Sequence, residues 1–130
     1  VAARNHEGLA TLTAIRQLPI MADESVFGFQ DALALLSRHA VNHINIKLMK
    51  TGGLAEAAKI DAACASCGVT TMVGCMIESN LSLVPAIAFA AVHDNVTFTD
   101  LDAVYMVKKQ QAGIQTNGPQ LTIGDPMHDA

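Results

Sequence analysis

Apolar residues recur at helical spacing in several stretches of the chain. Leu9, Leu12 and Ile15 lie three residues apart, and together with Leu18 they form one apolar stripe on a helix. This pattern predicts an amphipathic helix over residues 7–18, which Pro19 would end because proline cannot continue a helix. Further helices are predicted over residues 29–36, 54–67 and 81–93.

Short, mainly apolar runs separate the predicted helices. They end in polar or glycine-containing loops, which is the pattern of strands buried in a parallel sheet. The predicted strands cover residues 20–22, 43–48, 71–76 and 96–99. They begin about 25 residues apart, which is the spacing of strand–helix units with right-handed crossovers. The order of elements therefore predicts an α/β protein with four parallel strands.

Two architectures accommodate four strand–helix units. A (β/α)₈ barrel needs about 250 residues for its eight units, so four strands in 130 residues correspond to half of a barrel. A doubly wound open sheet would need no further strands, but the glycine-rich G-x-G-x-x-G turn expected after one of its strands is absent. The half-barrel is favoured, and the open sheet remains the alternative. After residue 105 no clear period is present, which predicts an extended tail packed on another part of the protein.

Composition and charge narrow the classes of function. The chain has 8 Lys and Arg against 12 Asp and Glu, without a basic run, which disfavours nucleic acid as a partner. The longest apolar run, from Leu83 to Val92, is interrupted by Pro85 and is shorter than the roughly 18 residues that cross a bilayer. An odd number of cysteines, three, without a secretory signature favours reduced thiols in the cytoplasm. The chain begins at Val1 in what reads as the middle of a domain, so we expect it to be part of a longer protein.

Candidate chemistry lies at the carboxyl ends of the predicted strands, where parallel α/β proteins bind ligands. Those ends carry residues 23–25 (Asp-Glu-Ser), Lys47, residues 78–79 (Glu-Ser) and residues 100–102 (Asp-Leu-Asp). Each acid taken singly also has a plain structural explanation, because loop carboxylates are usually solvated or cap a helix.

Lys47 is the hardest of these residues to explain by structure alone. Side chains alternate between the two faces of a strand, so Ile46 and Leu48 are expected to face the helices and Lys47 the interior of the barrel. Burial disfavours an ammonium ion and lowers the pKa of a lysine, which would make Lys47 a usable base near neutral pH. Lys50, in the following loop, is expected to be solvated.

The cysteines and histidines do not indicate a metal site. Cys64 and Cys67 form a C-x-x-C, but they share a helical core stripe and lack a second ligand pair for zinc. The five histidines show no H-E-x-x-H or comparable spacing. Core packing is the favoured interpretation of the cysteine pair.

Two motifs resemble the muconate-lactonizing subgroup of the enolase superfamily. The first is I-M-A-D-E-S at residues 20–25, and the second is I-K-L-M-K-T-G-G at residues 46–53, which places Lys47 24 positions after Asp23. The resemblance implies the C-terminal half of a (β/α)₇β barrel. Residues 1–104 would form that half and residues 105–130 a C-terminal tail, while the capping domain and the first half of the barrel would lie outside this chain.

The resemblance also implies roles for individual residues. Asp23 matches the third carboxylate ligand of a divalent metal, Mg²⁺ or Mn²⁺, and Lys47 matches an acid/base catalyst that faces a second lysine, absent from this chain. Met76 and Ile77 match positions beside the bound substrate, and Glu78 is a weaker match.

The pair Asp100 and Asp102 resembles the D-x-D motif of dipeptide epimerases, whose two carboxylates hold the free amino group of the substrate. The implied reaction removes the proton α to a carboxylate of an L-Ala-D/L-Glu-type dipeptide, and the metal stabilises the resulting ene-diolate. The remaining half of the same protein and a homo-oligomeric assembly are the expected partners.

Other functions remain open. Muconate cycloisomerase, o-succinylbenzoate synthase and acylamino-acid racemase belong to the same superfamily, and the pair Asp100 and Asp102 argues against the first two. A non-catalytic binding module is a further alternative, because the chain alone holds one of three metal carboxylates.

Overall fold

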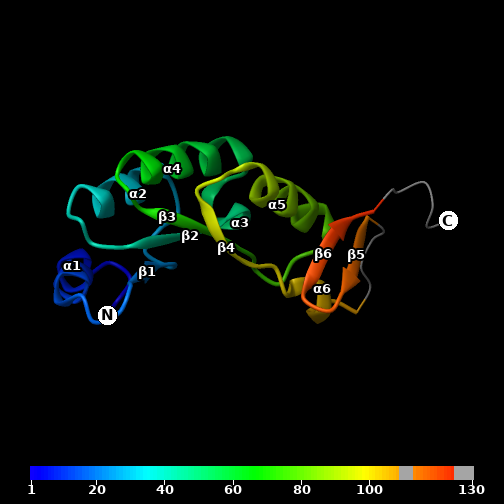
Figure 1. Ribbon diagram of the computed structural model, residues 1–130, viewed down its shortest axis with the longest axis horizontal. Coiled ribbons are helices and arrows are strands. Elements are labelled where there is room, and N and C mark those ends of the chain that lie inside the picture. The colour runs from blue at the N-terminus through cyan, green and yellow to red at the C-terminus, as the bar shows by residue number, and fades with distance from the viewer. Residues whose placement is uncertain (109–112, 125–130) are drawn as a thin grey trace.

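The computed structural model describes residues 1–108 and 113–124. Helices and strands alternate along the first hundred residues, and a hairpin follows them (Figure 1). In chain order the elements are α1 (His6–Ile15), β1 (Met21–Ala22), α2 (Phe29–Leu36), β2 (His43–Lys47), α3 (Leu48–Thr51), α4 (Leu54–Ser66), β3 (Thr70–Gly74), α5 (Asn80–Val92), β4 (Val96–Asp100), α6 (Ala103–Met106), β5 (Ile114–Asn117) and β6 (Gln120–Ile123).

The four predicted strands form one parallel sheet in the order β1-β2-β3-β4. Sequential parallel neighbours joined by helices are the arrangement of a barrel wall, so the predicted α/β class with four parallel strands is confirmed. Lys47 pairs with Gly74, and Gly74 pairs with Asp100. The carboxyl ends of β2, β3 and β4 therefore lie level with one another at one rim of the sheet.

The hydrophobic core lies between the sheet and the helices. Ile44 and Ile46 of β2 and Val73 of β3 are completely buried, as the alternation predicted, and they pack with Leu35 of α2 and Ile60 of α4. Helices α2, α4 and α5 lie along the same side of the sheet in Figure 1.

The opposite face of the sheet is much more open. Phe98 of β4 leaves 49% of its surface exposed, and it meets the ring of His43 edge to face with the ring centroids 5.4 Å apart. An open inner face with an exposed aromatic ring belongs to a sheet that closes on further strands. This is what the C-terminal part of a barrel presents.

Most element boundaries differ from the predictions by one or two residues, and β3, for example, ends at Gly74 rather than at residue 76. Larger differences concern the first helix and the stretch after β2. The first helix ends at Ile15, because Arg16 adopts a left-handed conformation (φ 56°) and its N–H bonds to the carbonyl of Thr13. It therefore stops before Pro19 is reached. The short helix α3 directly after β2 was not predicted, and Gly52 closes it with a left-handed φ of 86°.

The segment after residue 105 contains structure that the sequence pattern did not reveal. Strands β5 and β6 form an antiparallel hairpin, with Asn117 paired to Gln120. The two-residue connection starts at Gly118 with φ 58°, and glycine permits such a positive φ in a tight hairpin turn. Strand β6 packs against α5. Residues 105 and 106 of the predicted tail belong to α6, residues 109–112 and 125–130 lie outside the described residues, and the division at residue 104 remains a prediction.

Within residues 1–108 and 113–124, none of the helices combines the length and the apolar character that crossing a bilayer requires.

Candidate active site

Asp23 lies directly after β1 and is held between two lysines. The Nζ atom of Lys47, at the end of β2, is 2.9 Å from Asp23 Oδ2. The Nζ atom of Lys50, on α3, is 2.5 Å from Asp23 Oδ1 and donates a second hydrogen bond of 2.7 Å to the backbone carbonyl of Asp23. The structure thus brings together two of the residues singled out from the sequence, Asp23 and Lys47, and adds a third.

The electrostatics of this cluster favour the charged form of Asp23. Burial by itself would raise the pKa of Asp23, but hydrogen bonds and charges from Lys50 and Lys47 together bring its pKa below the ordinary value. Asp23 is therefore a carboxylate at neutral pH.

The expected lowering of the Lys47 pKa is wrong for this arrangement. Burial does act in that direction, but the hydrogen bond and the negative charge of Asp23, with smaller effects from Glu24 and Cys75, raise the pKa of Lys47 above its ordinary value. Burial alone lowers the pKa of an ammonium group, but the fold also places the carboxylate of Asp23 beside Lys47.

Lys50 was expected to be solvated, and this was also wrong. Only 6% of its side chain is exposed, and its ammonium group lies 5.6 Å from the centre of the Phe27 ring, a cation–π distance. A signal was present in the sequence: Lys50 follows Lys47 by three residues, so a single helical turn after the strand returns it to the same side. Without knowledge of α3, that signal could not be used.

The loop after β3 carries three further predicted site residues. Met76 and Ile77 have exposed side chains at the rim. Glu78 is buried: its Oε1 accepts a 3.0 Å hydrogen bond from the Met76 backbone N–H and its Oε2 accepts one from the Ser82 hydroxyl. Both carboxylate oxygens of Glu78 are thus held by residues of its own loop and of the first turns of α5.

Gly74 leaves room for a neighbouring side chain below the rim. A Cβ atom at this position would come within 2.5 Å of Asn45 Oδ1. Asn45 is buried, with an exposed fraction of 5%. Its Oδ1 atom has no hydrogen-bond partner within the part of the chain that the structure describes. Any residue larger than glycine would therefore collide with the Asn45 amide.

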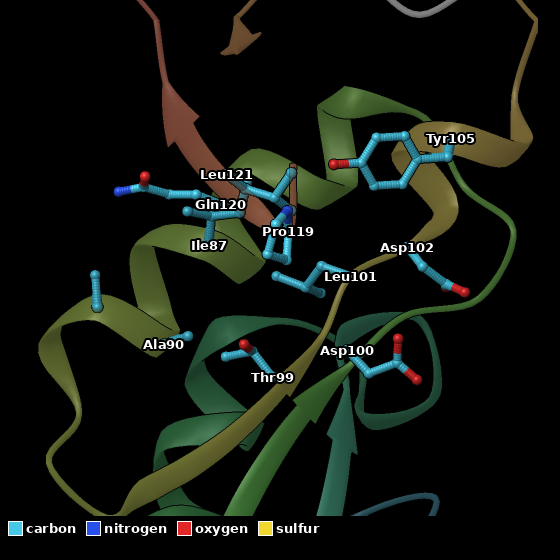
Figure 2. A pocket seen from close by; sticks show the side chains of 11 residues that line it. Ile87, Ala90, Thr99, Asp100, Leu101, Asp102, Tyr105, Pro119, Gln120 and Leu121 are labelled. Carbon is cyan, nitrogen blue, oxygen red and sulfur yellow. The ribbon is translucent and has the colours of Figure 1, made fainter. Parts of the chain in front are cut away.

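Asp100 and Asp102 lie together at the end of β4. Figure 2 shows both carboxylates pointing to the same side of the chain. Cys75 lies between them and β3, with Sγ 3.4 Å from the Asp100 carbonyl and 3.9 Å from Asp102 Oδ1. Burial, with the charges of Asp102, Glu78 and Asp100, raises the pKa of Cys75 and keeps it a thiol that can donate.

An open cavity of about 530 Å³ adjoins the two aspartates. It lies between α5, the end of β4 and the hairpin, and Ile87, Leu101 and Leu121 form its apolar wall (Figure 2). Figure 2 shows Leu101 on the cavity side of the chain and the carboxylates of Asp100 and Asp102 on the other side, and both aspartates are exposed to solvent.

In its described residues, the same rim offers a divalent metal a single carboxylate ligand rather than a complete site. Within residues 1–108 and 113–124, no three His, Cys, Asp or Glu side chains are grouped so that they could hold a metal ion. Asp23 offers one ionised carboxylate, the type of ligand that Mg²⁺ prefers. The chain therefore fits a divalent site as the source of one ligand.

The parallel wall, the open inner face and the charged rim define this chain as part of a parallel β/α barrel. It belongs to the family described as enolase C-terminal domain-like, whose model matches residues 1–124.

Several proteins that are similar to this chain in sequence are named as dipeptide epimerases. The chain is 43% identical over 118 residues to the L-Ala-D/L-Glu epimerase of Bacillus subtilis, covering 89% of this chain and 32% of that protein. It is 45% identical over 106 residues to the hydrophobic dipeptide epimerase of Enterococcus faecalis, covering 81% of this chain and 30% of that protein. The chain thus spans about a third of the length of these relatives.

Solved structures agree with the sequence comparison. The substrate-liganded complex of the B. subtilis epimerase superposes with a TM-score of 0.90 at 41% identity, covering 95% of this chain and 35% of that one. The E. faecalis dipeptide epimerase, complexed with Mg and the dipeptide L-Leu-L-Tyr, gives a TM-score of 0.85 at 42% identity over 88% of this chain and 33% of that one.

Proposed function

We propose that this chain supplies the C-terminal half of the barrel of a dipeptide epimerase that acts on L-Ala-D/L-Glu-type dipeptides. The observation that carries the proposal is the placement of two sets of charges on one rim: Lys47 with Asp23 on one side, and Asp100 with Asp102 on the other. The remaining strands, the other metal carboxylates and a second lysine would come from residues outside this chain.

Lys47 is the acid/base group in this proposal. Its ammonium lies at the end of β2 with 14% of the side chain exposed, so it can reach a substrate on the inner side of the rim. Lys47 would remove or return the proton at the α-carbon on one face, and a lysine on the opposite face would do the reverse. A divalent cation, Mg²⁺ or Mn²⁺, held by Asp23 and by other carboxylates would stabilise the negative charge that develops on the substrate.

Asp100 and Asp102 would hold the terminal ammonium group of the dipeptide. Lys47 and Asp100 are separated by one intervening strand, and two strand spacings of about 4.8 Å place their backbones roughly 10 Å apart. A dipeptide is of this length, since neighbouring α-carbons lie about 3.8 Å apart and the side chains fill the remainder. One end of the substrate would meet Lys47 while the other meets the aspartates.

The loop after β3 would line the binding site between Lys47 and the two aspartates. Met76 and Ile77 expose apolar surface there and would contact the body of the dipeptide. Glu78, whose carboxylate is bonded within its own loop, would contribute to substrate binding by holding that loop in place.

The test compares free and N-acetylated L-Ala-L-Glu in a complete barrel that carries these residues. We expect the free dipeptide to be epimerised and the acetylated one to be a poor substrate, because acetylation removes the ammonium charge. Asp102→Asn should lower kcat/KM on the free dipeptide by about tenfold to a hundredfold, in keeping with the loss of a charge-assisted hydrogen bond of about 1.5–3 kcal/mol. Equal turnover of both substrates by the parent enzyme would instead favour an acylamino-acid racemase.

A further inference from the structure

The carboxylate of Asp23 has two oxygens, and each contacts a different lysine. Oδ2 faces Lys47 and Oδ1 faces Lys50. A metal cation that binds Asp23 needs one of these oxygens, and two ammonium groups on one carboxylate already leave an excess of positive charge. A cation that binds Asp23 would therefore compete, through charge repulsion and for space at the oxygen, with at least one of the two ammonium groups.

The surroundings of the two ammonium groups are unequal. Lys50 Nζ also donates to the backbone carbonyl of Asp23 at 2.7 Å and lies over the Phe27 ring at 5.6 Å. Its side chain is 6% exposed, against 14% for Lys47. Removing Lys50 from Oδ1 would leave a buried ammonium with fewer partners, which is costly, whereas Lys47 stands at the open rim.

We propose that Lys50 is a positioning residue that holds Oδ1 of Asp23, so that Oδ2 is presented to the metal in exchange for Lys47. This inference rests on the proposed function, in which Asp23 is a metal ligand and Lys47 the acid/base group. It assigns different roles to two lysines three residues apart. Lys50 remains on the carboxylate, and Lys47 is released toward the substrate when the cation binds.

The exchange makes opposite predictions for the two lysines. Lys47→Met removes the group that competes for Oδ2, so Mg²⁺ should bind about threefold to tenfold more tightly. Lys50→Met leaves Oδ1 without its partner and lets the carboxylate turn both oxygens toward Lys47, so Mg²⁺ should bind about tenfold more weakly. A purely electrostatic effect would tighten metal binding in both variants, since each loses a positive charge.

The experiment is a calorimetric titration of the substrate-free complete barrel with Mg²⁺, which reports metal binding independently of turnover. Lys50→Arg should keep the parent affinity within about threefold, because a guanidinium keeps the positive charge and can donate to Oδ1 as the ammonium group does. Lys59→Met is the matched control: Lys59 is exposed on α4 and pairs with Glu56, so its removal should leave Mg²⁺ affinity unchanged.

The outcomes separate this inference from the proposed function. Tighter Mg²⁺ binding by Lys50→Met would overturn the role of Lys50, and so would unchanged binding by Lys47→Met, which remains measurable if Lys50→Met does not fold. Asp23→Asn is titrated in parallel. Unchanged Mg²⁺ affinity in that variant would overturn the metal site itself and with it both proposals, whereas a large loss in Asp23→Asn with equal signs for the two lysines would overturn only the exchange.

Discussion

At the scale of single residues, the rim of the sheet shows how strongly a partner changes the chemistry of a buried charge. Lys47 taken alone is a lysine on the inner face of a strand, and burial lowers the pKa of such a group. Placed 2.9 Å from Asp23 Oδ2, its pKa is raised instead. In the proposed mechanism, a cation on Asp23 would weaken this ion pair and release the ammonium group of Lys47 toward the substrate.

Replacing Lys47 by alanine should abolish epimerisation while preserving exchange of the α-proton for one substrate enantiomer. The lysine on the opposite face would still remove its proton, but the return from the other side would be lost, and acid–base groups contribute about 10²- to 10⁴-fold to rates. Proton NMR in D₂O measures exchange and inversion separately. Lys59→Ala should be indistinguishable from the parent. Inversion by Lys47→Ala at the parent rate would remove Lys47 from the mechanism.

At the scale of elements, a buried polar cluster ties α4 to the beginnings of two strands. Asp61 of α4 accepts hydrogen bonds from Thr71 Oγ1 at 2.6 Å, His93 Nδ1 at 2.8 Å and Asn95 Nδ2 at 3.1 Å. His93 in turn stacks on Phe89, with ring centroids 3.8 Å apart. Thr71 lies near the start of β3 and Asn95 just before β4, so this cluster occupies the end of the sheet opposite the charged rim, where barrels place stabilising residues.

Asp61→Ala should therefore cost stability and leave catalysis intact. It removes the acceptor of three hydrogen bonds at a site where Asp61 is 5% exposed, while Thr71 and Asn95 each keep a second, longer hydrogen bond to a backbone carbonyl. We expect a loss of roughly 3 kcal/mol in the free energy of unfolding. Urea denaturation of the complete barrel measures that loss, and kcat/KM should stay within about twofold. Asp61→Asn, which keeps one acceptor oxygen, should lose less. A loss of activity without a loss of stability would assign Asp61 to the catalytic rim.

At the scale of the whole molecule, the sheet is left open on two sides. Among the residues that the structure describes, the edge strand β4 pairs with β3 only, and β1 contributes just two residues, Met21 and Ala22. Phe98 exposes an aromatic ring on the inner face. Parallel sheets are ordinarily covered on both faces and leave few edges free, because unpaired backbone groups and apolar surface promote association.

The isolated 130-residue chain should consequently be poorly stable and devoid of epimerase activity. We expect a broad thermal transition and association rather than a cooperative unfolding of monomers. Sedimentation velocity combined with circular dichroism checks both expectations. Co-expression with the preceding segment of a barrel provides the matched comparison and should restore a sharp transition. A cooperative, monomeric melt of the chain alone would show that the four strands form an independent unit.

The succession of helices and strands could be predicted from the sequence alone. Apolar residues recur about every 3.6 residues along a helix and every 2 along a strand, and both periods can be recognised within a short stretch of sequence. Ile44 and Ile46 followed that rule and are fully buried. The same reasoning located Asp23, Lys47 and the pair Asp100 and Asp102, since strand ends carry the chemistry of parallel α/β proteins. Only the tertiary structure placed Lys50 against Asp23 and formed the hairpin after residue 113. Both depend on contacts between segments that no local period encodes: a lysine is solvated or buried according to what packs over it, and a two-residue turn holds its strands together only where another element covers them.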